Sequence, residues 1–274
     1  MAARIATTIR KWMSGATRTS SVHGPSTLSA RPARVRGQSY NLRYHMKLLN
    51  DGNHKTRKGE KKGWKTFGLH LAPHKLAGRN VCAHASPGCA DACLNTAGRG
   101  IMHSVQDARI RKTKYFFEKK AEFLLQLRKE IISAEKRSEK NDWGACFRLN
   151  LTSDLPWHKL GIPDVFSHLQ FYDYTKDLNR FRFFLSGKLP DNYDLTFSRS
   201  ELTKDSLVRE LCNAGGNVAV VFRGHLPDEW QGIEVINGDE DDLRFKDPKG
   251  KIVGLEAKGL GKKDETGFVL EPNN

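Results

Sequence analysis

Short apolar runs that end in polar clusters recur along the second half of the chain. Four of them are typical of β-strands, and short helical segments lie between them, of which Lys204–Ala214 is the clearest because Gly215 and Gly216 follow as a helix stop. Strands about 20–25 residues apart with helices between them predict parallel βαβ units and an α/β fold. The four runs are Cys146–Leu151, Leu169–Tyr172, Tyr193–Phe197 and Asn217–Phe222, and the polar clusters that follow are 152–154, 173–176, 198–201 and 223–224.

Two further elements precede these units. The alternating run Thr66–Ala72 predicts a strand, which Pro73 ends. From His103 to Arg137, apolar residues recur at helical spacing between charged ones, which predicts one long amphipathic helix. The apolar positions of this helix are Phe117, Ala121, Leu124, Leu127 and Ile131.

The polar clusters all follow the carboxyl ends of predicted strands. In parallel α/β folds, ligands bind beyond those ends. One polar strand end would be an ordinary loop, but four in succession favour a shared ligand site.

Three of the five cysteines fall between Cys82 and Cys93, with the spacing C-x6-C-x3-C, and His84 lies in the first gap. Thiolates this close in sequence can converge on one metal ion or one iron–sulfur cluster. The alternatives are three unrelated thiols, or a disulfide and a spare thiol. Cys146 and Cys212 lie alone in apolar surroundings, where we expect buried core residues.

Charge is unevenly distributed along the 274 residues, whose formal net charge is +15. Residues 1–50 contain nine Lys or Arg and no Asp or Glu, whereas residues 66–274 are close to neutral. We therefore expect a disordered basic arm over residues 1–38 and a single folded domain over residues 39–274. Such an arm is also typical of an organelle transit peptide, or of a tail that binds nucleic-acid phosphates.

Other features limit the location and the remaining ligands. No apolar run approaches the ~18–20 residues of a membrane helix, and the odd, clustered cysteines favour a reducing compartment, so we expect a cytoplasmic protein without membrane contact. The basic segment Lys55–Lys62 predicts a surface loop that touches an anionic ligand. The acidic run Asp239–Asp242 is either a divalent-cation site or a solvated loop.

The motifs together resemble a known architecture. The order of a strand, a three-cysteine loop, a long helix and repeated βα units resembles radical S-adenosylmethionine enzymes. More closely, the chain over about residues 40–270 resembles an uncharacterised family of bacteriophage-encoded proteins related to that superfamily. The motifs that carry this resemblance are Val81–Cys82, Gly88–Cys93, Thr96–Gly100, Leu149–Asp154, Phe171–Lys176, Thr196–Glu201, Asp242–Phe245 and Gly254–Gly259.

The resemblance implies a partial (β/α) barrel, similar to a TIM barrel, with a [4Fe–4S] cluster. Cys82, Cys89 and Cys93 would ligate three irons, and S-adenosylmethionine would bind the fourth and yield a 5′-deoxyadenosyl radical. Lys176 or Arg199 would bind a carboxylate or phosphate, and Asp173 or Glu201 an amine or ribose hydroxyls. The residues expected to line this pocket are Asn150, Ser153, Asp154, Asp173, Lys176, Ser198, Arg199 and Glu201.

The chain also departs from the radical-enzyme pattern. The usual spacing is C-x3-C-x2-C, and no Gly-Gly-Glu segment follows the second strand. Two other functions therefore stay open: a structural zinc protein with Cys82, His84, Cys89 and Cys93 as ligands, and a nucleic-acid-binding accessory protein that uses the basic arm. The substrate, a small molecule or a nucleotide, and the oligomeric state are not specified by these patterns.

Overall fold

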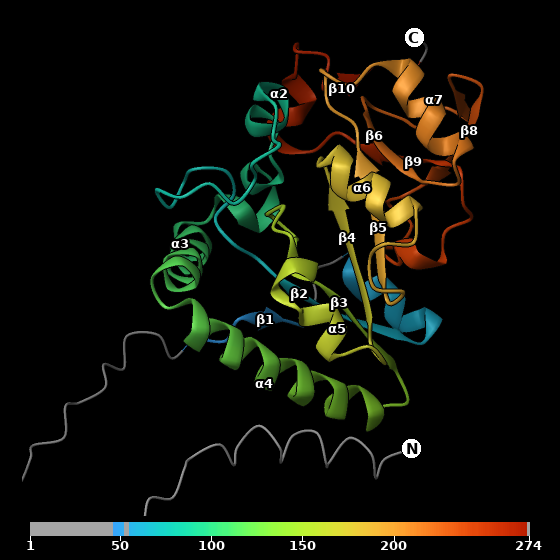
Figure 1. Cartoon of the computed structure of the whole chain (residues 1–274). Helices are drawn as coiled ribbons and strands as arrows, with labels where there is room; N and C mark the ends of the chain where they lie inside the picture. The colour runs from blue at the N-terminus through green and yellow to red at the C-terminus, as the bar shows by residue number, and fades with distance from the viewer. Residues whose placement is uncertain (1–45, 52–54, 273–274) are drawn as a thin grey trace, which may run out of the picture. The chain divides into compact units, whose positions relative to one another are not determined.

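The computed structural model describes residues 46–51 and 55–272 (Figure 1). The predicted arm over residues 1–38 lies outside the described residues. No helix of the described chain is both long and apolar enough to cross a membrane.

The centre of the fold is one mostly parallel sheet with the strand order β1-β2-β3-β4-β5-β6-β9-β8-β7. Strands β2 to β6, β9 and β8 run parallel, whereas β1 and β7 pair antiparallel with their neighbours. The sheet is open, so the described strands do not close a barrel. The strands are β1 Leu49–Asn50, β2 Trp64–Leu69, β3 Gly144–Arg148, β4 Gln170–Thr175, β5 Tyr193–Ser198, β6 Val218–Phe222, β7 Glu229–Trp230, β8 Ile233–Asn237, β9 Ile252–Glu256 and β10 Val269–Leu270.

The helices connect successive strands. The α-helices are α2 Pro87–Asp91, α3 His103–Glu118, α4 Lys120–Glu139, α5 Ile162–Val165, α6 Leu178–Leu185 and α7 Asp205–Asn213. The 3-10 helices are η2 Thr56–Lys62, η3 Leu94–Thr96, η4 Gly98–Ile101, η5 Trp157–Leu160, η6 Arg244–Lys246 and η7 Gly259–Lys263. All five predicted strands and the helix Lys204–Ala214 are confirmed, with small shifts of their ends.

The predicted helix from His103 to Arg137 is wrong in one respect, because it is two helices at an angle to each other (Figure 1). Lys119 leaves the helical conformation with φ −137° and ψ 54°. The break lets aromatic rings on both sides of it meet: the Phe116 and Phe123 ring centroids lie 5.3 Å apart and those of Tyr115 and Phe123 5.4 Å. Helical periodicity continues through the break, so the sequence pattern does not show it.

The core lies between the helices and one face of the sheet. Side chains alternate along a strand, so Phe67, Phe147 and Phe171 share this face, with ring centroids 5.6 and 5.3 Å apart. From α4, Phe123 and Leu127 are fully buried against them. Burying side chains of this size contributes about 1.5–3 kcal/mol each.

The opposite face of the sheet is more polar and is covered by the acidic run and η6. The Asp242 carboxylate is fully buried there and receives two hydrogen bonds, of 2.8 and 2.9 Å, from Arg148 Nη1. Lys55 Nζ lies 3.3 Å from it, and Lys62 Nζ lies 2.6 Å from Asp241. Basic side chains therefore neutralise the acidic run, and its members Asp241 and Asp242 are buried and do not form a solvated loop.

The short strand β10 positions the residues around the end of β5. It pairs with β6 at Val221 and Phe222, beyond the point where β5 leaves β6 at Ala219. The segment before β10 consequently lies against Arg199, whose Nη1 donates a 2.9 Å hydrogen bond to the Gly267 carbonyl oxygen.

Candidate functional site

The cysteine loop follows β2 and docks on the carboxyl end of β3. The Asp154 N–H donates to the Val81 carbonyl oxygen at 2.8 Å, and Thr152 Oγ1 donates to that of Leu71 at 2.6 Å. The Cys82 thiol lies 3.9 Å from the Thr152 carbonyl oxygen and accepts from the His74 N–H at 3.4 Å. The first cysteine therefore lies at the carboxyl ends of the strands, where the sequence predicts the ligand site.

The second cysteine is held by the short helix α2. Ser86 caps this helix, accepting from the Cys89 N–H at 3.2 Å, and Pro87 occupies its first turn. Glu201, from the loop after β5, accepts hydrogen bonds from Ser86 Oγ at 2.6 Å and from the Gly88 N–H at 2.8 Å. A Cβ at Gly88 would lie 2.2 Å from Thr266 Oγ1 and 2.9 Å from the Glu201 carboxyl group, so a larger residue would displace these side chains.

The three thiols are free and partly buried, so the disulfide alternative is wrong for this structure. Burial raises the pKa of all three, that of Cys82 to about 12, and the charges of Cys89 and Cys93 raise it further. Each thiol is thus within electrostatic reach of the other two. No group of three or more His, Cys, Asp or Glu side chains in residues 46–51 and 55–272 is arranged to hold a metal ion.

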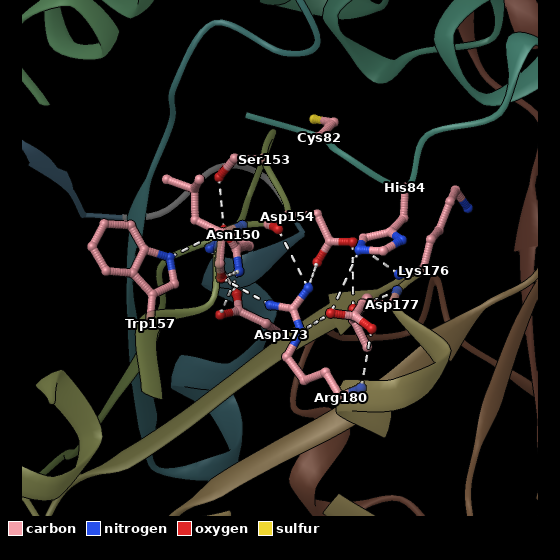
Figure 2. Close-up of polar contacts among 12 residues, drawn as sticks. Cys82, His84, Asn150, Ser153, Asp154, Trp157, Asp173, Lys176, Asp177 and Arg180 are labelled. Carbon is pink, nitrogen blue, oxygen red and sulfur yellow. Dashed lines mark hydrogen bonds and ion pairs between the residues drawn. The ribbon is translucent and has the colours of Figure 1, made fainter. Parts of the chain in front are cut away.

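His84 is directed at Asp177 and not at the Cys82 thiol (Figure 2). Its Nε2 lies 3.5 Å from Asp177 Oδ2, and Figure 2 shows the imidazole directed at Asp177 while the Cys82 sulfur lies apart. In this conformation His84 does not complete a four-ligand zinc set with the three cysteines.

Two cations come from the sheet side, and of these Lys176 lies within electrostatic reach of Cys89 and Cys93. Lys176 Nζ donates to Ser198 Oγ at 2.7 Å and to the carbonyl oxygens of Ser198 and Arg199 at 3.2 and 3.1 Å. Burial lowers the pKa of Lys176, and the charge of Cys89 opposes this. Arg199 is 8% exposed, and its Nε has no hydrogen-bond partner.

A third cation comes from α3. Arg109 is 8% exposed and donates from Nη1 to Asn95 Oδ1, while its Nε has no partner. Burial lowers its pKa, and the Cys93 charge opposes this. In the part of the chain that the structure describes, none of Arg109, Lys176 and Arg199 forms an ion pair, which distinguishes them from the buried Arg148, Arg180 and Arg244.

Other predicted site residues form a hydrogen-bond network around Asn150, which Figure 2 shows below the Cys82 thiol. Asn150 Oδ1 accepts from Ser153 Oγ, the Leu155 N–H and Trp157 Nε1 at 2.8–3.0 Å. Asp173 is fully buried and accepts from the Asn150 N–H at 2.7 Å and from Tyr193 OH at 3.0 Å. Burial raises the pKa of Asp173 to about 7. This network shapes the loop after β3.

Asp154 connects that network to the thiol side. It forms a 2.5 Å ion pair with the buried Arg180 and accepts from the Lys176 N–H at 2.9 Å. The structure thus brings Asp154, Lys176, Ser198, Arg199 and Glu201 together around the cysteine loop. Asn150, Ser153 and Asp173 instead belong to the hydrogen-bond network around Asn150.

Sequence reasoning missed Arg109. Nothing separates it in sequence from the other basic residues of α3, which are mostly exposed. Its role depends on the fold of the cysteine loop, because Asn95 follows Cys93 by two residues and its backbone N–H hydrogen-bonds to the Cys93 thiol.

A model of the protein family described as Gene product 88 matches residues 47–272. The chain belongs to this family. The match includes all three clustered cysteines and the cations around them, so the site lies within the family's own domain. It supports the phage-type part of the resemblance seen in the sequence, but says nothing of radical enzymes. No curated protein and no solved structure matches the chain.

Proposed function

We propose that this Gene product 88 protein binds a [4Fe–4S] cluster through Cys82, Cys89 and Cys93 and acts on S-adenosylmethionine, as radical S-adenosylmethionine enzymes do. The observation that carries the proposal is the set of three free thiols with Lys176 and Arg109 within electrostatic reach, two cations that form no ion pair among the described residues.

The donor chemistry fits such a cluster. Fe–S clusters are held by cysteine thiolates, and three ligands leave one iron free for a small molecule. Thiolates and cluster carry negative charge, which Lys176 and Arg109 would neutralise in a partly buried site.

The fold supports the same proposal. Strands β2 to β6 lie in chain order in the sheet, as the strands of a partial (β/α) barrel do. The cysteine loop follows β2, the first parallel strand, and polar side chains gather at the carboxyl ends of the strands that follow. These are the positions that the radical-enzyme architecture uses.

The chain's own residues would have distinct tasks. Glu201 orients α2 and with it Cys89. Lys176 and Arg199 would bind an anionic group of a ligand, and Asp154 keeps the backbone of Lys176 in place. When bound and reduced, the cluster would supply one electron that cleaves the sulfur–C5′ bond of S-adenosylmethionine, giving methionine and a 5′-deoxyadenosyl radical.

Anaerobic purification tests the cluster. We expect brown protein with iron and acid-labile sulfide, and a Cys89→Ala variant that loses most of both. Cys212→Ala is the matched control, because Cys212 lies on α7, is buried in the main core and should leave the iron content unchanged. Colourless wild-type protein with one tightly bound zinc would contradict the proposal and favour a structural zinc site.

A second measurement tests the reaction. S-adenosylmethionine should change the electron paramagnetic resonance spectrum of the reduced protein, and 5′-deoxyadenosine should form under strong reductant. An iron-containing protein that shows neither would carry a structural cluster.

A further inference from the structure

A second group of polar side chains lies beside the thiols, where the end of β2 meets α3. The Ala72 N–H donates to Thr113 Oγ1 at 2.8 Å, and Thr113 Oγ1 donates to the Arg109 carbonyl oxygen at 2.9 Å. This relay joins the end of β2 to the turn of α3 that carries Arg109. As a result, His70 at the end of β2 lies within electrostatic reach of Arg109, Lys112 and Arg148.

These three cations differ in their partners. Arg148 is neutralised by the two hydrogen bonds it makes to Asp242. Lys112 donates to the Leu48 carbonyl oxygen at 2.7 Å and has Glu130 within electrostatic reach. Among the described residues, no carboxylate is one of the charged groups that act on Arg109, and the group that does is the Cys93 side chain.

Two hydrogen-bonding atoms in this group have no partner. Arg109 Nε and His70 Nδ1 are both buried, and neither has a hydrogen-bond partner within residues 46–51 and 55–272. A buried guanidinium without a counter-ion is strongly unfavourable, and so is a buried polar atom without a hydrogen bond. Both costs would be removed by one group that carries negative charge and accepts hydrogen bonds.

We infer that Arg109 and His70 form an oxyanion subsite beside Cys93, which takes a carboxylate or phosphate group of the ligand. Two oxygens of either group match the planar donor fork of arginine, and a neutral imidazole donates a further hydrogen bond. The inference deepens the proposed function and rests on it for what the ligand does there. The subsite is separate from Lys176 and Arg199, which lie at the β4 and β5 side of the thiols.

The test is oxyanion binding by the full-length protein, prepared without oxygen. Isothermal titration with inorganic phosphate and with acetate, at constant ionic strength in chloride, separates the two sources of the oxyanion. We expect the wild type to bind at least one of the two anions. The Arg109→Met substitution should weaken the binding of that anion about tenfold or more, as expected for a lost charge-assisted hydrogen bond. Arg109→Lys should keep part of the affinity, and His70→Ala should also weaken it.

Arg111→Met is the matched control, because Arg111 is exposed on the same helix. It should bind like the wild type. Wild type that binds neither probe, or an Arg109→Met variant that folds and binds like the wild type, would overturn the subsite and leave Arg109 a support for Asn95. If Arg109→Met does not fold, the Arg109→Lys and His70→Ala affinities decide.

Iron measured in the same samples separates this inference from the proposed function. If the wild type contains no iron but the Arg109→Met substitution weakens its binding of phosphate or acetate, the subsite is supported and the cluster is contradicted. If the wild type contains iron but binds neither phosphate nor acetate, the cluster is supported and the subsite is contradicted.

Discussion

At the scale of single residues, His70 illustrates how burial among cations sets protonation. Burial, followed by the charge of Arg109, lowers the pKa of His70 from 6.5 to about 3. The imidazole is therefore neutral in the folded protein at neutral pH. In the unfolded chain it is protonated once the pH falls below about 6.5.

This difference predicts an acid-sensitive fold. Between pH 6.5 and about 3 the unfolded chain binds one more proton at His70 than the folded protein, so the stability that neutral His70 provides is lost as pH falls. His70→Gln should remove the contribution of His70 to the fall in the free energy of unfolding, which is roughly 2 kcal/mol between pH 6.5 and pH 5. Urea unfolding at the two pH values measures it, with His225→Gln at an exposed position as the control for the substitution. An unchanged difference between the two pH values would contradict this account.

At the scale of elements, the cysteine helix α2 is too short to be stable alone and depends on its neighbours. Glu201 satisfies the Gly88 N–H at its first turn, and Ser86 caps it. Thr266, just before β10, closes the space above Gly88. Two distant segments thus hold the loop that carries Cys89.

Loss of the Glu201 carboxylate should therefore loosen this loop without unfolding the protein. In metal-free protein, Glu201→Ala should increase the rate of Cys89 labelling by a thiol reagent roughly five- to thirty-fold, the factor for 1–2 kcal/mol of local stability. Stopped-flow labelling with mass-spectrometric assignment measures this. Glu210→Ala, an exposed position on α7, should label like the wild type, and an equal rate in Glu201→Ala would show that α2 does not need the carboxylate.

At the scale of the whole molecule, the excess of positive charge is partly neutralised within the described fold. Lys55 and Lys62, near the beginning of the described chain, pair with Asp242, Glu240 and Asp241, near its end. Two lysines of the basic segment thus bind the protein's own acidic run. This contact covers the polar face of the sheet.

Asp242 should be the residue on which this contact depends most. Asp242→Asn leaves the buried Arg148 without its counter-ion, which costs about 3–5 kcal/mol. Chemical denaturation should show a decrease of this size in the free energy of unfolding. Glu240→Gln removes an exposed partner of Lys62 and should cost less than about 0.5 kcal/mol. Equal effects of the two substitutions would mean that burial of the Arg148–Asp242 pair contributes nothing.

The sequence alone determined the strands and the cysteine loop. Apolar runs such as Tyr193–Phe197 are buried wherever the chain folds, and the three thiols are close because the loop between them is short. It did not determine that the helix breaks at Lys119, because that break depends on aromatic contacts across it.

The tertiary structure alone decided which polar residues surround the thiols. Side chains alternate along a strand, so Asp173 shares the helix-facing side with Phe171 and is bound by Asn150 and Tyr193 below the site. Arg109 lies near Cys93 because α3 packs on the end of β2, a contact between residues far apart in sequence. Local patterns reveal which residues form an element, whereas charge pairing and the surroundings of a site depend on how the elements pack.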